Sequence, residues 1–139
     1  MTPVEQAPET YIPHRPPVAC LDAVLFVDQS RALTRRTIVG EAVLGGRIWE
    51  PWLIEGLAQT AAVLNGNNEM KIGRRSAKGM LVGIRNLRIH RRPELGETIQ
   101  FEVELVKRIS PLTLIEGRAR VGDEEIAAGQ MKFYVELVS

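Results

Sequence analysis

A single carboxylate stands in a long apolar segment of this 139-residue chain. The segment covers residues 51–68 and reads PWLIEGLAQTAAVLNGNN, with Glu55 as its one ionisable side chain. A carboxylate in such surroundings costs free energy unless it is paired, solvated or protonated. The simplest function that explains it is proton transfer to or from a bound molecule. Glu55 is therefore the first candidate catalytic residue.

Gln59 follows Glu55 by one helical turn, so an amide and a carboxylate are expected on one helix face, together with Trp52. The two side chains could hold one substrate between them. A structural alternative is a Glu55 that caps a backbone group or pairs with an arginine across a subunit contact. Spacing alone leaves both interpretations open.

The residues around Glu55 predict one long buried helix. Apolar side chains recur at intervals of four and three residues, at Leu53, Leu57, Ala61 and Leu64. Other apolar residues widen this stripe to almost the whole circumference. Pro51 suits the first helical turn, and the run 65–68, Asn-Gly-Asn-Asn, is expected to end the helix. Such a helix belongs inside a fold.

Strands are predicted on both sides of this helix. Their ranges are 18–28 and 32–42 with a turn at 28–31, 80–89 with a bulge near Asn86, 98–107, and a hairpin of 112–121 and 126–138 around Gly122-Asp123. The strand at 98–107 alternates cleanly between apolar and polar residues. We expect an α+β fold, with an antiparallel sheet of about six strands wrapped around one central helix. Residues 1–17 are expected to form an irregular proline-rich arm, and residues 18–139 a single domain.

The composition excludes several functional classes. Hydrophobic residues make up 45% of the chain, and 18 basic residues balance 17 acidic ones, so the overall charge selects neither a nucleic acid nor a membrane. A single Cys20 and two histidines argue against a disulfide framework, a zinc cluster or another metal cofactor. With no signal-like or membrane-spanning segment, the expected location is the cytoplasm.

Three motifs occur in order: YIPHRPP at 11–17, LIEGLAQTAAV at 53–63 and GIRNLRIHRRPELGETIQFEVEL at 83–105. Together they resemble the hot-dog-fold 3-hydroxyacyl-(acyl carrier protein) dehydratase family. Its members carry a Pro-His-Arg entry segment, a helix reading E-x-x-A-Q, and an Arg-Pro-x-x-x-Gly-Asp turn. The resemblance implies that Glu55 is the carboxylate that protonates the leaving hydroxyl, with Gln59 as its companion. It also implies an acyl-carrier-protein or coenzyme A thioester as substrate, and a homodimer or higher homo-oligomer.

One element of that family pattern is missing. The family places a base histidine in a Gly-His-Phe-Pro-Gly loop before the helix, whereas residues 39–51 read VGEAVLGGRIWEP and contain no histidine. Ungapped counting puts Glu41 at that position. The loop and helix are similar to a histidine-lacking subgroup associated with aryl-polyene-type clusters. His14 matches the family's Pro-His-Arg histidine, either as a structural residue or as a substitute acid-base group.

Basic residues gather between Lys71 and Pro93, where eight occur without an acidic residue. Carrier proteins are acidic and coenzyme A carries phosphates, so Arg85 and Arg88 are candidate recognition residues. A solvated face is the structural alternative, and nucleic acid is disfavoured because no aromatic residues accompany the arginines. Trp49 and Trp52 flank the helix start and are candidates for the acyl entrance, or for packing.

Three functions compete at this stage. A dehydratase would use Glu55 as an acid, together with a base that the sequence does not identify. A thioesterase would use Glu55 to activate water or to attack the thioester, which requires no histidine. An acyl or carrier-protein binding module would keep the pocket without turnover.

Overall fold

The computed structural model describes residues 6–8, 21–39, 43–44, 47–48, 50–71 and 77–137. The elements follow in the order β1 (Ala23–Val27), β2 (Arg31–Thr37), β3 (Val43–Leu44), β4 (Arg47–Ile48), α1 (Glu50–Lys71), β5 (Ala77–Ile89), β6 (Thr98–Ile109), β7 (Leu112–Val121) and β8 (Glu124–Leu137). Six strands form an antiparallel sheet in the order β1-β2-β6-β7-β8-β5, and β3 pairs with β4 in a small hairpin.

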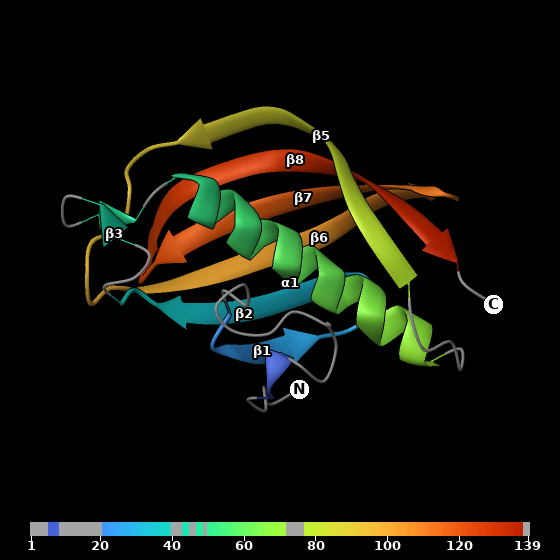
Figure 1. Ribbon diagram of the computed structural model, residues 1–139, viewed down its shortest axis with the longest axis horizontal. Helices are drawn as coiled ribbons and strands as arrows, with labels where there is room; N and C mark the ends of the chain where they lie inside the picture. The colour runs from blue at the N-terminus through green and yellow to red at the C-terminus, as the bar shows by residue number, and fades with distance from the viewer. Residues whose placement is uncertain are drawn as a thin grey trace.

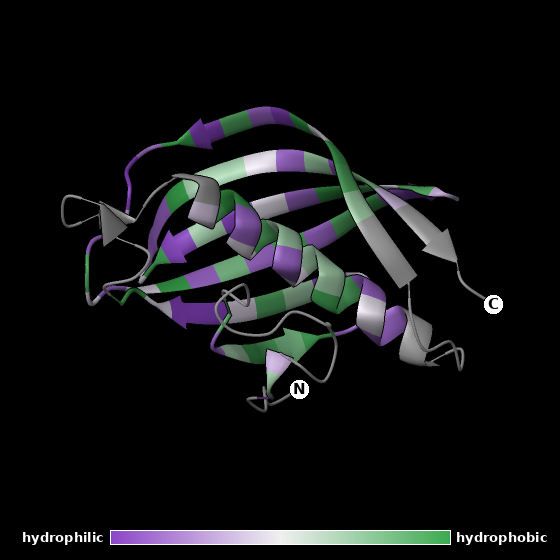
Figure 2. Cartoon of the chain, viewed as in Figure 1, coloured by the Kyte–Doolittle hydropathy of each residue, from purple (hydrophilic) through white to green (hydrophobic). Residues whose placement is uncertain are grey.

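Helix α1 crosses one face of the curved sheet (Figure 1). Every side chain from residue 52 to residue 68 is buried or half-buried, as the all-round apolar pattern predicts. The sheet supplies the other side of the core with its inward residues, which include Ala32, Ile99, Phe101, Val103, Ile115, Ala119, Met131 and Phe133. Hydrophilic and hydrophobic residues alternate along the strands (Figure 2). The predicted hot-dog architecture, one sheet around one helix, is confirmed.

The predicted end of the helix is wrong, because α1 continues through the Asn-Gly-Asn-Asn run to Lys71. Asn67 Nδ2 donates to the Asp28 carbonyl at 3.2 Å, and Asn68 Nδ2 donates to the Gln29 carbonyl at 3.1 Å. These bonds attach the last turns of the helix to the β1–β2 turn. The intrinsic preference against helix, about 1 kcal/mol for a glycine, is therefore overcome by tertiary contacts.

The β1–β2 turn itself lies where the sequence predicted it. Asp28 Oδ1 accepts the backbone N–H groups of Ser30 and Arg31, both at 2.8 Å. The edge strand β1 is joined on its outer side by Gln6, whose backbone exchanges two 2.8 Å hydrogen bonds with Val24. Most of the predicted proline-rich arm, residues 1–5 and 9–17, lies outside the described residues.

The predicted bulge in β5 is also confirmed. The pairing of β5 with β8 shifts register between Arg85 and Arg88, and Asn86 within this gap has a φ of 53°. Asparagine tolerates this left-handed conformation better than most residues. The bulge changes which side chains of β5 face the helix, and it explains the slip in the apolar alternation.

The helix approaches the sheet most closely at Gly56. The ring of Phe101 on β6 lies against this glycine, and a Cβ at residue 56 would overlap the ring. A glycine inside a helix is destabilising by itself, so this one serves the close approach of helix and sheet. The contact sets the depth at which α1, and with it Glu55, lies in the fold.

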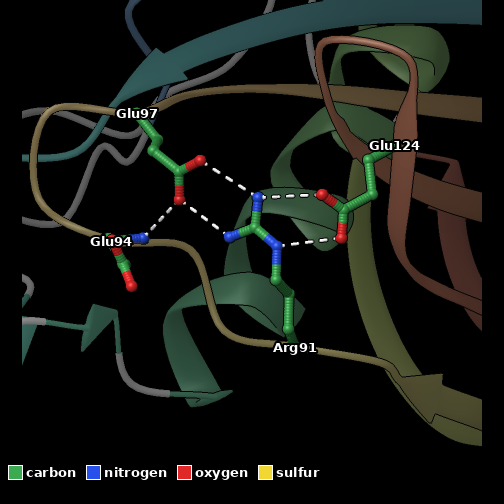
Figure 3. Close-up of polar contacts among 4 residues, drawn as sticks. All are labelled: Arg91, Glu94, Glu97 and Glu124. Atoms are coloured by element: carbon green, nitrogen blue, oxygen red, sulfur yellow. Dashed lines mark hydrogen bonds and ion pairs between the residues drawn. The ribbon is translucent and has the colours of Figure 1, made fainter.

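The turn between β5 and β6 lies within the third sequence motif and is held by ion pairs (Figure 3). Arg91 donates two hydrogen bonds to the Glu97 carboxylate, at 2.8 and 3.0 Å, and two to the Glu124 carboxylate, at 2.9 and 3.2 Å. Glu97 also accepts the backbone N–H of Glu94 at 2.7 Å. We call Arg91, Glu97 and Glu124 the arginine clamp.

The motif glycine completes this turn. Gly96 has a φ of 89°, a left-handed conformation that disfavours other residues, and its N–H donates to the Ile38 carbonyl at 3.0 Å. The Ile38 N–H in turn donates to the Glu97 carbonyl at 2.9 Å. The glycine and acidic residue of the motif are therefore structural, since they fasten the start of β6 to the end of β2.

We predict that Gly56→Ala lowers the free energy of unfolding by about 1–3 kcal/mol, because the new methyl group displaces the Phe101 ring. Alanine is the better helix former, so propensity alone predicts the opposite sign. Urea denaturation measures the change. Adding Gly56→Ala to a Phe101→Leu background should cost much less, and an equal cost in both backgrounds would contradict the proposed contact.

Hydrogen bonds from Arg91, and secondarily from the Glu94 N–H, lower the pKa of Glu97 from 4.5 to about 2. A lowered folded-state pKa stabilises the protein above the unfolded-state pKa, and the contribution disappears as the pH falls through the folded-state pKa. We predict that Glu97→Gln lowers the free energy of unfolding by about 1–3 kcal/mol at pH 7. The difference from wild type should shrink between pH 4.5 and about 2.

Urea denaturation at several pH values tests this prediction. The matched control is Glu104→Gln, at an exposed position of β6. Its effect on stability should be small at every pH in this range. A pH-independent loss in the Glu97 variant would show that the carboxylate charge is not what stabilises the turn.

Candidate functional site

The two helix residues predicted to act together are in direct contact. Gln59 Nε2 donates to Glu55 Oε1 at 2.8 Å. Gln59 is only 1% exposed, whereas Glu55 is half-buried. Among the described residues, no basic side chain lies within ion-pair distance of Glu55. The amide therefore orients a carboxylate whose charge is not neutralised by an arginine or lysine of the described chain.

A second polar pair lies deeper, between the helix and β2. Thr60 Oγ1 donates to the Gly56 carbonyl at 2.7 Å, and the hydroxyl oxygens of Thr34 and Thr60 are 2.8 Å apart. Since the Thr60 proton is directed at Gly56, Thr34 is the donor between the two hydroxyls. Both threonines are fully buried and satisfied. This pair holds α1 to β2 and leaves no group free for chemistry.

Arg36 was not among the residues predicted from the sequence to form the site. It lies on β2 at an inward position, in alternation with Ala32 and Thr34, and is only 9% exposed. Its Cζ atom is 5.4 Å from the centroid of the Trp52 ring, and its buried Nε has no hydrogen-bond partner. No carboxylate of the described residues is within ion-pair distance of it. The alternation of β2 was the signal that could have identified an inward arginine.

The remaining candidates separate into two groups. Arg85 and Arg88 are exposed on β5, and Trp52 is half-buried at the start of α1. Glu41, His14 and Trp49 lie outside the described residues, so their roles stay predictions. Within the described part, no group of three or more His, Cys, Asp or Glu side chains could hold a metal ion. Across the same part, no helix has the length and apolar character needed to cross a membrane.

The sheet wrapped around the central helix defines a hot-dog domain, and the half-buried Glu55 carboxylate lies on that helix. A family model described as ApeP-like, ApeP dehydratase, matches residues 6–136. The chain therefore belongs to the ApeP-like dehydratase family.

Individual relatives agree with this assignment. The 3-hydroxyacyl-[acyl-carrier-protein] dehydratase FabZ of Oceanobacillus iheyensis is 28% identical over 144 residues, covering 98% of this chain and all of that protein. The dehydratase heterocomplex ApeI:P from Xenorhabdus doucetiae matches with a TM-score of 0.87 at 20% identity, over 94% of this chain and 91% of that one. A hypothetical thioesterase from Streptococcus pneumoniae, solved with coenzyme A, matches with a TM-score of 0.69 at 9% identity, over 82% and 84%. The two structural matches show the shared fold.

Arg36 and Arg91 allow a comparison between an arginine without a carboxylate partner and an arginine that pairs with two carboxylates. We predict that Arg36→Met leaves the free energy of unfolding within about 1 kcal/mol of wild type or raises it, because a buried cation without a carboxylate does not favour folding. Arg91→Met should lower it by about 1–3 kcal/mol, because four charge-assisted hydrogen bonds are lost. Urea denaturation of both variants measures the difference. A large loss for Arg36→Met would mean that the guanidinium has a stabilising partner.

Proposed function

We propose that this chain is a subunit of a 3-hydroxyacyl-thioester dehydratase and that Glu55 is its general acid. The observation that carries the proposal is the half-buried Glu55 carboxylate, held by Gln59 and free of any described basic partner. Glu55 also falls on the helix motif of the FabZ-like dehydratases. A structural carboxylate in this position would gain more from a cation than from a neutral amide.

The geometry divides the two carboxyl oxygens of Glu55 between two tasks. Gln59 donates to Oε1, which leaves Oε2 to carry the proton that goes to the substrate's 3-hydroxyl group. The α-proton leaves to a base, the electron pair of the broken C–H bond ends in the new Cα–Cβ double bond, and the hydroxyl departs as water with the proton from Glu55. The carboxylate is then reprotonated for the next cycle.

The base is proposed to come from a second subunit. Residues 39–51 contain no histidine, and the ApeI:P structure is named as a heterocomplex. A related hot-dog chain that carries the loop histidine would complete the site opposite Glu55. A homodimer in which Glu41 is the base is the alternative from the sequence, and mass measurement of the purified assembly separates the two arrangements.

The sheet offers a place for such a partner. Gln6 covers the β1 edge, but among the described residues no strand pairs with the outer edge of β5. This edge carries exposed apolar side chains, with Met80 64% and Val82 50% exposed. A long uncovered edge with apolar residues pairs readily with another chain. We therefore place the subunit contact at β5.

The positive charge on β5 indicates what kind of carrier bears the acyl group. Arg85 and Arg88 are exposed on β5 within the basic stretch 71–93. An acidic acyl carrier protein, or the phosphates of coenzyme A, would be attracted to these guanidinium groups. We propose a carrier-protein thioester as the substrate, with Arg85 and Arg88 at the docking surface.

We predict that Glu55→Gln lowers kcat for dehydration of a 3-hydroxyacyl thioester by about 10²–10⁴-fold, the usual contribution of a general acid. The assay uses the assembly of this chain with its natural partner subunit, and follows enoyl thioester formation or its hydration in reverse. Glu104→Gln, at an exposed position of β6, is the matched control and should retain full activity.

The same assay discriminates the other functions. A full rate in the Glu55→Gln assembly would remove Glu55 from the mechanism. Release of free thiol from a saturated acyl thioester, without loss of water from the hydroxy substrate, would identify a thioesterase. Tight thioester binding without either reaction would identify a binding module.

A further inference from the structure

Arg36 is a buried cation without a described counter-charge. It projects from the helix-facing side of β2, and its Nε is buried without a hydrogen-bond partner. Its guanidinium group lies over the face of the Trp52 ring, 5.4 Å from Cζ to the ring centroid. An arginine of this kind differs from Arg91, whose nitrogens donate to two carboxylates. The interior therefore holds a positive charge that the described chain does not balance.

The N-terminal end of α1 adds to the positive charge near Arg36. Trp52 lies in the first turn of the 22-residue helix α1, at the end that carries the positive pole of the helix dipole. The guanidinium and the helix end are therefore two positive groups close together. Burial of an unpaired charge costs several kcal/mol unless an anion compensates it. The first turn of α1 and Arg36 together favour an anionic oxygen at this position.

The spacing of Trp52 and Glu55 along α1 indicates which oxygen of the substrate would lie beside Arg36. Trp52 and Glu55 are three residues apart on one helix face, a rise of about 4.5 Å along the axis. An anion beside Trp52 is therefore close to the atoms on which Glu55 acts. The phosphate of a pantetheine arm is separated from the thioester by the length of that arm, and does not fit this short spacing. The thioester oxygen, next to the α-carbon, does fit.

We propose that Arg36 donates a hydrogen bond to the thioester oxygen and neutralises the enolate that forms during dehydration. This inference rests on the proposed function of Glu55. When the base removes the α-proton, the C–H pair forms the Cα–C1 double bond and the carbonyl π pair moves onto oxygen, which becomes the enolate. The pair on oxygen then re-forms the carbonyl, the Cα–Cβ double bond forms, and the hydroxyl leaves as water with the Glu55 proton.

Trp52 has a separate part in this arrangement. The ring supports the planar guanidinium without accepting its N–H groups, so the donors stay available for the substrate. A charged donor held in place before the reaction stabilises developing negative charge without having to reorganise. Arg36 is thus a catalytic residue in contact with the reacting oxygen, and Trp52 is a positioning residue that acts through Arg36.

An acetoacetyl thioester tests the proposal without turnover. Its α-protons are acidic, and its enolate is detected by ultraviolet absorbance, so titration gives the apparent pKa of the bound acetoacetyl group. In the assembly with its partner subunit, the wild-type chain should lower this pKa relative to the free thioester. Arg36→Met should remove at least one unit of that lowering, a tenfold change in enolate fraction. Arg36→Lys, which keeps the charge but not the planar fork, should restore part of it.

Controls separate this inference from the proposed function. Arg35→Met removes the neighbouring arginine of β2, which lies within 3.9 Å of Asp22, and should leave the enolate signal unchanged. Glu55→Gln should slow dehydration by the factor predicted above and keep the enolate signal, whereas Trp52→Leu should weaken the signal. If Glu55→Gln stays active while Arg36→Met loses the signal, the role of Glu55 fails but the anion site stands.

Two outcomes overturn the proposal. One is an Arg36→Met assembly that stabilises the enolate as well as wild type does. The other is an Arg36→Met chain that separates from its partner subunit in light scattering, which would show that Arg36 pairs with a carboxylate across the interface. The stability of the variant, expected to equal or exceed that of wild type, shows whether a lost signal comes from unfolding.

Discussion

The structure depends on the burial of one apolar helix against one face of a curved antiparallel sheet. Helix α1 approaches β6 so closely that residue 56 has no room for a side chain beside Phe101. That contact determines how deep the helix lies, and the strands alternate their apolar residues to cover it. Any polar group on the inner faces must then be satisfied inside the protein or be used there, because solvent is largely excluded from these faces.

The polar side chains of the inner faces differ in how fully their hydrogen-bonding groups are paired. The hydroxyls of Thr34 and Thr60 are fully paired and serve only to join helix and strand. Glu55 is held by a neutral amide, which orients the carboxylate without cancelling its charge. Arg36 lies over the aromatic ring of Trp52, and its Nε has no hydrogen-bond partner. The less a buried group is satisfied by the described chain, the stronger is the argument that a substrate or a partner completes it.

The motif that resembles an Arg-Pro-x-x-x-Gly-Asp turn illustrates the opposite case. Its glycine, Gly96, is required for the left-handed backbone conformation of the turn. Its acidic residue, Glu97, accepts hydrogen bonds from Arg91 in the arginine clamp (Figure 3). Through Ile38 they also fasten the end of β2 that carries Arg36. The turn contributes to the site by holding its walls in place, and the chemistry is proposed to lie with the helix and β2.

The sequence by itself determined the central helix, the strands after it, the β5 bulge and the contact of Glu55 with Gln59, because each depends on local periodicity or on one-turn spacing. It misplaced the end of α1, since the bonds of Asn67 and Asn68 to the distant β1–β2 turn do not appear in a local pattern. Only the tertiary structure shows that the charge of Arg36 has no counter-charge among the described residues. Whether an inward arginine is paired depends on which residues of other elements surround it, and the fold places an aromatic ring there and, among the described residues, no carboxylate.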